Sequence, residues 1–115
     1  MTINPSQMLD VIEAMENYIE RNRPPEHIRE ELDIGYKIID QSIFVFEIRP
    51  QVNKPEIKVE INSAKATFVK AKNYWKVFWM KSDMSWHSYP PMPTVKTVKE
   101  FVDLIEEDKY CFFWG

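Results

Sequence analysis

The chain has 115 residues, of which 44% are hydrophobic and 29% are charged, and its formal net charge is -3. This length fits one globular unit, so we expect residues 1–115 to form a single domain around one hydrophobic core. Only two glycines occur, Gly35 and Gly115, which excludes a glycine-rich phosphate-binding loop and a dinucleotide-binding fingerprint.

No apolar run reaches the roughly 20 residues that are needed to span a bilayer. The first residues, Met1 to Pro5, do not resemble a signal peptide. Cys111 is the single cysteine, so no internal disulfide can form, which is typical of a reducing compartment. We therefore expect a cytoplasmic protein with no membrane partner.

The first predicted element is an amphipathic helix. Asn4 can cap it, Pro5 suits the first helical position, and Gln7 can complete a capping box. Apolar residues then recur at spacings of three and four and form one stripe, namely Met8, Val11, Ile12, Met15, Tyr18 and Ile19. Pro24-Pro25 ends the helix, because a proline has no N–H to donate.

The middle of the chain changes from a period of 3.6 to a period of 2, which predicts β-strands. Residues 36–38 and 44–48 predict two strands joined by a tight turn at Asp40-Gln41. Residues 74–80 and 86–89 predict two more, which follow turns at Asn73 and Asp83.

The strand between these pairs changes its alternation. Apolar residues occupy odd positions from Ile57 to Ile61, and even positions from Ala64 to Phe68. Side chains alternate strictly along a strand, so this change predicts a bulge or a turn near residues 62–63.

The end of the chain predicts a second helix and a docked terminus. Thr97 and Glu100 form a capping box, and the buried stripe behind it is Val98, Phe101, Val102 and Ile105. Residues 109–115 are so aromatic that we expect them to dock on the sheet or the helix as an extended segment. The predicted fold class is therefore α+β, with an N-terminal helix and a C-terminal helix packed on an antiparallel sheet of about five strands.

Three segments resemble a small bacterial family of uncharacterised proteins: 45–50, 75–87 and 108–115. In that family a run W-x-x-x-W-x-(K/R)-x-D-x-x-W-H precedes a proline-rich turn, and the chain ends on an aromatic residue and a glycine. Here the run starts at Trp75, with Lys81 at its basic position. The resemblance extends from about Tyr36 to the end of the chain. It implies a shared fold and no catalytic residue, because the family is a domain of unknown function.

The function that the sequence favours is a small non-enzymatic binding or interaction module. Its aromatic-rich region, residues 75–87, contains Trp75, Trp79 and Trp86. Both faces of several predicted strands carry aromatic side chains, more than two helices can cover. This excess predicts a partner surface, and a homodimer is the simplest partner because symmetric dimers are the commonest oligomers.

Binding of single-stranded nucleic acid is the first alternative. Residues 61–82 contain five lysines and no acidic residue, namely Lys65, Lys70, Lys72, Lys76 and Lys81. Lysines that alternate with aromatic residues can bind phosphates while the rings stack on bases. Against this, Trp75 and Trp79 share a strand face with Val77, as a core strand requires. Lysines also protect exposed strand edges from aggregation, and the net acidity is unusual for a nucleic-acid binder.

A small hydrolase-type enzyme is the second alternative. His87 can act as a general base oriented by Asp83 or Glu47, and Glu47 with Arg49 can form an acid–base or anion-binding pair. The competing interpretation is structural: Asp83 caps a turn, His87 makes a hydrogen bond, and Glu47 pairs with Arg49 at the surface.

Cys111 and His87 can form a thiol–imidazole dyad. The aromatic neighbours of Cys111 instead predict an apolar setting in which the thiol is inert. His27, His87 and Cys111 show no zinc-type spacing, so we expect no metal site and no cofactor.

Overall fold

The computed structural model describes residues 3–114. Its elements are α1 (Pro5–Asn22), a short 3-10 helix (Glu26–Ile28), β1 (Asp33–Ile39), β2 (Ser42–Pro50), β3 (Lys58–Val69), β4 (Tyr74–Met80), β5 (Trp86–Ser88), β6 (Thr94–Val95) and α2 (Val98–Glu107). The six strands form one antiparallel sheet in the order β1-β2-β3-β4-β5, and β6 also pairs with β4. The predicted α+β fold with two helices is confirmed. β6 was not predicted, because a strand of two residues is too short for a periodic signal.

Both helices begin where their caps were predicted. The Oδ1 atom of Asn4 accepts a hydrogen bond from the Gln7 N–H at 2.8 Å, and the Oγ1 atom of Thr97 accepts one from the Glu100 N–H at 3.1 Å. These bonds satisfy backbone donors that have no partner inside the helix. One residue of the expected α1 stripe is misplaced, because Ile12 is 39% exposed.

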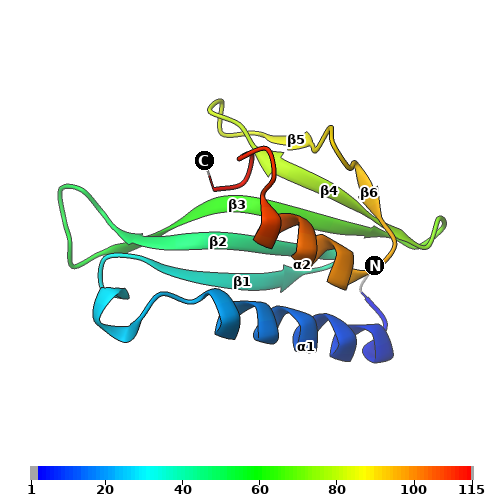
Figure 1. The fold of residues 1–115 in the computed structure, drawn as a ribbon, viewed down its shortest axis with the longest axis horizontal. Coiled ribbons are helices and arrows are strands. Elements are labelled where there is room, and N and C mark those ends of the chain that lie inside the picture. The colour runs from blue at the N-terminus through cyan, green and yellow to red at the C-terminus, as the bar shows by residue number, and fades with distance from the viewer. Residues whose placement is uncertain (1–2, 115) are drawn as a thin grey trace.

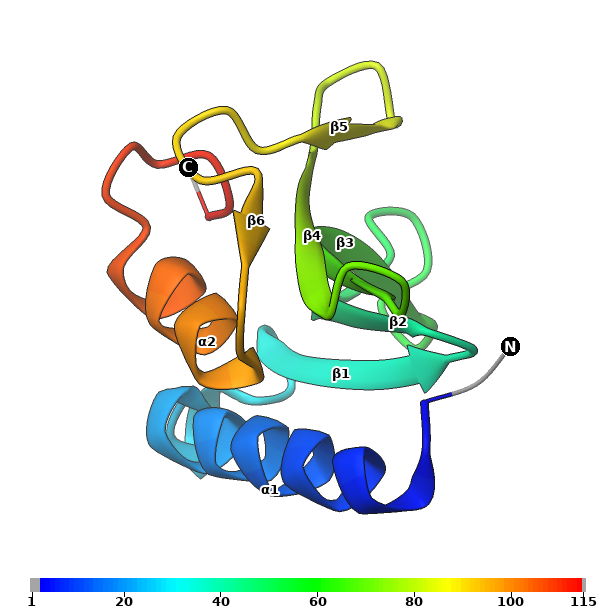
Figure 2. The ribbon, with the colours of Figure 1, turned by 90° about the vertical axis from the view of Figure 1, so that its right-hand side faces the viewer.

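The helices lie on one side of the sheet. In Figure 1, α2 lies in front of the strands and α1 runs alongside β1. Figure 2 shows α2 on one side of β4, with no helix on its other side. We call the side of the sheet toward the helices the covered face, and the opposite side the outer face.

The core lies between the covered face and the helices. Its strand residues are Ile43, Val45, Ala64, Ala66, Trp75 and Val77, and its helix residues include Val11, Met15, Phe101 and Ile105. Trp75 is 1% exposed. Burial of large apolar side chains of this kind is the main source of folding free energy. The apolar residues of β2 at the intervening positions, including Phe44 and Phe46, belong to no part of this core cluster.

The predicted irregularity in β3 is a bulge within one continuous strand. Val45 pairs with Ala64 while the next residue, Phe46, pairs with Asn62, so Ser63 is the extra residue. Before the bulge, the odd-numbered residues of β3 share the covered face with Glu47. They are nevertheless exposed, because the hairpin of β2 and β3 extends beyond both helices (Figure 1).

The turns at Asp40 and Asn73 are confirmed, and both residues adopt positive φ angles, of 53° and 54°. Asp and Asn tolerate this region better than most residues. No helix of the described residues is long and apolar enough to cross a membrane.

The aromatic C-terminal segment docks on the covered face, as predicted. The ring of Phe112 lies 4.4 Å from Trp79 and 5.4 Å from Tyr89, and Phe113 lies 4.7 Å from Tyr89. The segment forms turns and bends, so the expected extended conformation is wrong. The cause is Asp108, whose carboxylate bends the chain back by accepting hydrogen bonds from the N–H groups of Phe113 and Trp114.

Candidate functional site

Three aromatic rings surround the amino group of Lys65 on the outer face. The Nζ atom lies 5.7 Å from the ring centroid of Phe44, 4.7 Å from that of Phe78 and 5.2 Å from that of Trp86. β2, β3, β4 and β5 each supply one residue, because Lys65 pairs with both Phe44 and Phe78 across the ladders. We call these four residues the Lys65 cluster.

The Lys65 cluster is separate from the core, and all four of its side chains are half-buried. Burial lowers the pKa of Lys65 below its usual value, because water solvates the ammonium less well there. No carboxylate of the described residues forms an ion pair with it. Lys65 therefore presents an uncompensated positive charge among rings whose faces attract cations.

The outer face around the cluster is polar and basic. Lys76 is exposed and pairs with Thr67, whose Oγ1 atom lies 2.8 Å from the Oγ atom of Ser42. Farther along the sheet, Lys37 pairs with Glu60 at 2.9 Å. The net acidity of the chain therefore does not extend to this surface, since most acids lie in the helices and the loops.

The residues predicted to bind a partner or nucleic acid do not share one surface. Lys65, Lys76 and Trp86 lie on the outer face, and Lys70 and Lys72 are exposed in the turn between β3 and β4. Trp75, Trp79 and Lys81 do not belong to this outer surface.

Trp75 and Trp79 lie on the covered face, where Trp75 is fully buried. The Nζ atom of Lys81 lies 5.6 Å from the Trp79 ring. Phe44 and Phe78 were not predicted as binding residues. Phe78 alternates in step with Lys76 along β4, which was the available signal. Only the strand register shows that Phe44 and Phe78 both lie opposite Lys65.

Asp83 and His87 form the pair that the sequence suggested. The Nε2 atom of His87 lies 2.9 Å from Oδ2 of Asp83, and Oδ1 of Asp83 accepts a hydrogen bond from the Ser85 N–H at 2.9 Å. The His87 hydrogen bond, followed by that of Ser85, lowers the pKa of Asp83. Asp83 thus stabilises the turn before β5, as the structural interpretation predicted.

Glu47 and Arg49 also pair with each other, at 3.3 Å. They lie on β2, which β3 and β4 separate from His87 on β5. Three strand spacings correspond to roughly 14 Å, beyond the reach of a hydrogen bond. The structure therefore does not bring His87 together with Glu47 and Arg49 as a catalytic group.

Cys111 is exposed, which corrects the apolar setting expected for its thiol. Its φ angle of 58° places it in a tight turn whose aromatic neighbours Phe112 and Phe113 point into the covered face. Among residues 3–114, the His, Cys, Asp and Glu side chains form no group of three that can hold a metal ion.

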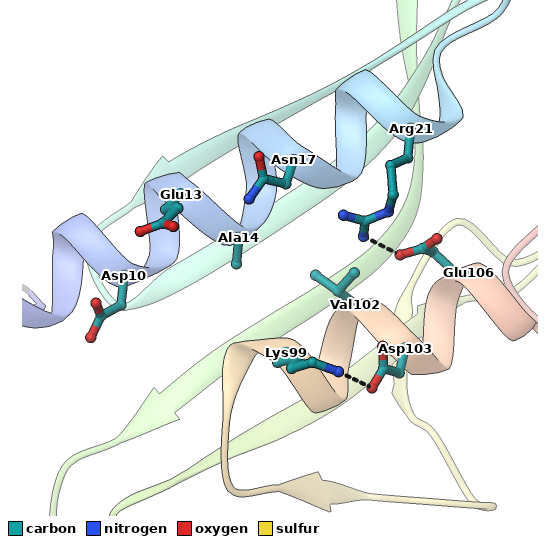
Figure 3. A pocket seen from close by; sticks show the side chains of 9 residues that line it. All are labelled: Asp10, Glu13, Ala14, Asn17, Arg21, Lys99, Val102, Asp103 and Glu106. Atoms are coloured by element: carbon teal, nitrogen blue, oxygen red, sulfur yellow. Dashed lines mark hydrogen bonds and ion pairs between the residues drawn. The ribbon is translucent and has the colours of Figure 1, made fainter.

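A groove of about 520 Å³ lies between α1 and α2 (Figure 3). Its lining is Asp10, Glu13, Ala14, Asn17, Arg21, Lys99, Val102, Asp103 and Glu106. Arg21 pairs with Glu106 and Lys99 pairs with Asp103, and the first contact lowers the pKa of Glu106. Four of the six charged groups therefore compensate one another. The sequence could not indicate this groove, because it depends on how the two helices pack.

The sequence of residues 4–115 matches the protein family described as "Domain of unknown function (DUF3024)". No curated protein and no solved structure matches the chain. Gly115, part of the aromatic-glycine ending, lies outside the described residues. The match extends over almost the whole chain, and the chain therefore belongs to the DUF3024 family.

Proposed function

We propose that this chain is a non-enzymatic binding module whose outer sheet face binds single-stranded nucleic acid. The observation that supports this most directly is the Lys65 cluster. Its rings can stack on bases and its ammonium can contact a phosphate, which are the two contacts that sequence-tolerant single-strand binders combine.

The charges on the outer face support the same ligand. Lys76 lies on the same face as the cluster, and Lys70 and Lys72 lie in the turn that follows β3. Glu60, which lies on β3 before the bulge, pairs with Lys37. A phosphate backbone that crosses the strands would therefore meet lysines that form no ion pair among residues 3–114.

The non-enzymatic part of the proposal rests on the separation of the titratable groups. His87 and Asp83 pair with each other at the turn before β5, whereas Glu47 and Arg49 pair with each other on β2. A hydrolase needs its general acid and base within reach of one substrate atom. The separation of these two pairs, on β2 and at the turn before β5, argues against a group of all four residues around one substrate atom.

The test is fluorescence anisotropy with a labelled single-stranded DNA of mixed sequence, over a series of salt concentrations. Four lysines can contact phosphates, Lys65, Lys70, Lys72 and Lys76, so the slope of log affinity against log salt should be no steeper than about -2.8. Absence of binding at low salt overturns the proposal. Binding that ignores salt also overturns it.

Matched variants locate the site. Trp86→Ala should weaken binding about 5- to 150-fold, the equivalent of one lost stacking contact of roughly 1–3 kcal/mol. Lys65→Gln should weaken it as well, whereas Lys99→Gln, on the opposite side of the molecule in α2, should not. Equal affinity of all three variants would assign the binding to another surface.

A further inference from the structure

The first part of β3 has a strand neighbour on one side only. β2 pairs with β3 from Lys58 onward, but β4 pairs with it only from Ala64 to Val69. Among the described residues, 58–62 therefore form an open sheet edge, at the base of the long hairpin on the left of Figure 1. Unpaired backbone donors and acceptors on such an edge can pair with another strand.

The direction of the backbone groups follows from one hydrogen bond. The carbonyl of Ile57 accepts from the Gln51 N–H, in the other limb of the hairpin, at 2.8 Å. Successive residues of a strand point their N–H and C=O groups to alternate sides. The backbone groups of Lys58 and Glu60 therefore face the open edge, while those of Val59 face β2.

The side chains of this edge are unusually apolar for an exposed strand. Ile57 is 44% exposed, Val59 is 36% exposed and Ile61 is 41% exposed. Ile57 comes directly before β3, and Val59 and Ile61 follow at alternate positions within it. The helices α1 and α2 do not extend over this end of the β2–β3 hairpin (Figure 1). Proteins commonly protect open edges with charges, prolines or short strands, and one face of this edge carries three β-branched apolar residues instead.

We propose that this edge pairs with the same edge of a second copy of the chain, antiparallel about a twofold axis at Val59. The segment 57–61, Ile-Lys-Val-Glu-Ile, is complementary to its own reverse. Ile57 lies opposite Ile61 of the partner, and Lys58 lies opposite Glu60 of the partner. On one face of the ladder between the two copies, all the side chains of residues 57, 59 and 61 are then apolar. On the other face, each lysine lies opposite a glutamate.

The same register satisfies the backbone. Lys58 and Glu60 are the residues whose N–H and C=O groups face the edge. In this register Lys58 of one copy and Glu60 of the other exchange two backbone hydrogen bonds, one in each direction. Twofold axes at Lys58 or at Glu60 would place like charges opposite each other, which destabilises a sheet. An axis at Ile61 would place Glu60 opposite Asn62 and lose the charge pairing.

The dimer extends the proposed function without depending on it. A twofold axis perpendicular to the sheet joins the two sheets into one and keeps both outer faces on the same side. Two Lys65 clusters would then lie on one continuous surface. Dimer formation is measured without nucleic acid, so either proposal can fail while the other stands.

Charge exchange gives a decisive test, because Lys58 and Glu60 also have partners within their own chain. Lys58 lies 3.4 Å from Glu30, and Glu60 lies 2.9 Å from Lys37. Exchanging both charges makes these internal pairs repulsive, but it restores opposite charges across the twofold axis. A local role and an intermolecular role therefore predict opposite results for the double variant.

The measurement is sedimentation equilibrium of the full chain at low salt. We expect a dimer for the parent protein, a dissociation constant at least tenfold higher for Lys58→Glu and for Glu60→Lys, and recovery of the dimer in the double variant K58E/E60K. A monomeric parent protein at 100-fold the working concentration of the binding assay overturns the proposal. A double variant weaker than both single variants also overturns it.

Disulfide cross-linking tests the register itself, in a Cys111→Ser background that removes the native thiol. Val59→Cys should form a disulfide-linked dimer, because directly opposed residues of a non-hydrogen-bonded pair have Cα atoms about 4.5 Å apart, within disulfide reach. Ile61→Cys is the control, since it lies opposite Ile57 of the partner and not opposite itself. Cross-linking of Ile61→Cys but not of Val59→Cys would contradict the register.

Discussion

Trp86 and His87 are consecutive residues of β5, yet their side chains lie on opposite faces of the sheet. The Trp86 ring lies 5.2 Å from the Nζ atom of Lys65 and 6.1 Å from the Phe44 ring on the outer face. His87 pairs with Trp79 across the ladder and contacts Asp83. The run 75–87, which resembles a family motif, therefore does not form one surface, because strand alternation divides it between the core and the outer face.

The placement of Trp75 and Trp86 on opposite faces predicts that their substitution by alanine reduces the stability of the fold by different amounts. Trp75→Ala should destabilise the fold by about 3–5 kcal/mol, because it opens a cavity in the core. Trp86→Ala should cost less than about 2 kcal/mol, because its ring is half-buried on the outer face. Urea unfolding followed by far-UV circular dichroism measures both values. Equal losses would contradict the assignment of the two faces.

Gly35 should tolerate no larger residue while Phe46 is present. A Cβ atom at Gly35 would lie 2.8 Å from Cε2 of Phe46, whose ring is 5% exposed and has little room to move. We expect Gly35→Ala to cost about 1–3 kcal/mol through overpacking. In a double-mutant cycle with Phe46→Leu, the two changes should couple favourably; simple additivity would show that the ring is not the obstacle.

Lys65 should reduce stability at neutral pH. Burial lowers its pKa in the folded state, so the cost is fully present below that pKa and disappears as the pH rises through the usual value of 10.5. Cation–π contacts offset part of this cost. We therefore expect Lys65→Met to gain less than about 1 kcal/mol at pH 7, with a gain that shrinks toward pH 10.5, while nucleic-acid binding falls. Thermal unfolding from pH 7 to pH 10.5 tests the trend, and a gain that grows with pH would contradict it.

Arg23 and Asp33 should link the end of α1 to the start of β1. The Nη2 atom of Arg23 lies 2.8 Å from Oδ2 of Asp33, and Nε also donates to this carboxylate. The hydrogen bond from Arg23 is the largest cause of the lowered pKa of Asp33. Its stabilisation is therefore present above the usual value of 3.8 and is lost as the pH falls through the folded-state pKa.

We expect Asp33→Asn to cost about 1 kcal/mol at pH 7, after allowance for the solvent exposure of Arg23. The difference from the parent protein should vanish below the folded-state pKa of Asp33. Urea unfolding at pH 7 and at a series of pH values below 3.8 measures it. Asp103→Asn, which removes an exposed pair within α2, serves as the control and should have almost no effect.

Asp108 should hold the C-terminal segment in place. Its carboxylate accepts hydrogen bonds from the N–H groups of Phe113 at 3.1 Å and Trp114 at 2.9 Å, and its φ angle is 41°. Asp108→Ala should cost about 1–2 kcal/mol and release Trp114 to water, which shifts its fluorescence to longer wavelength. Asp108→Asn keeps one of the two acceptor oxygens, for Phe113 or for Trp114, and tolerates positive φ, so it should lose less stability than Asp108→Ala; equal losses for both variants would contradict this role.

Local signals in the sequence were sufficient for the helix starts, two turns and the bulge, whereas the strands predicted at 36–38 and 44–48 extend over 33–39 and 42–50. Asn4 and Thr97 start the helices, Asp40 and Asn73 form turns, and the change of alternation near residue 63 is a bulge. Each signal depends on residues a few positions apart. The physics that produces it acts within one turn, one cap or one strand, and the remainder of the fold hardly alters it.

The candidate site depends on contacts between distant segments. In β2 the apolar residues at odd and at even positions are equally plausible core residues, and only the packing of the helices places Val45 in the core and Phe44 on the outer face. Lys65 gains its rings from three other strands. The sequence of this protein thus specifies its strands, turns and caps through local chemistry. Which face is buried, and which side chains meet on the other, follows from helix packing and strand register, since hydrophobic burial acts between parts of the chain that the sequence separates.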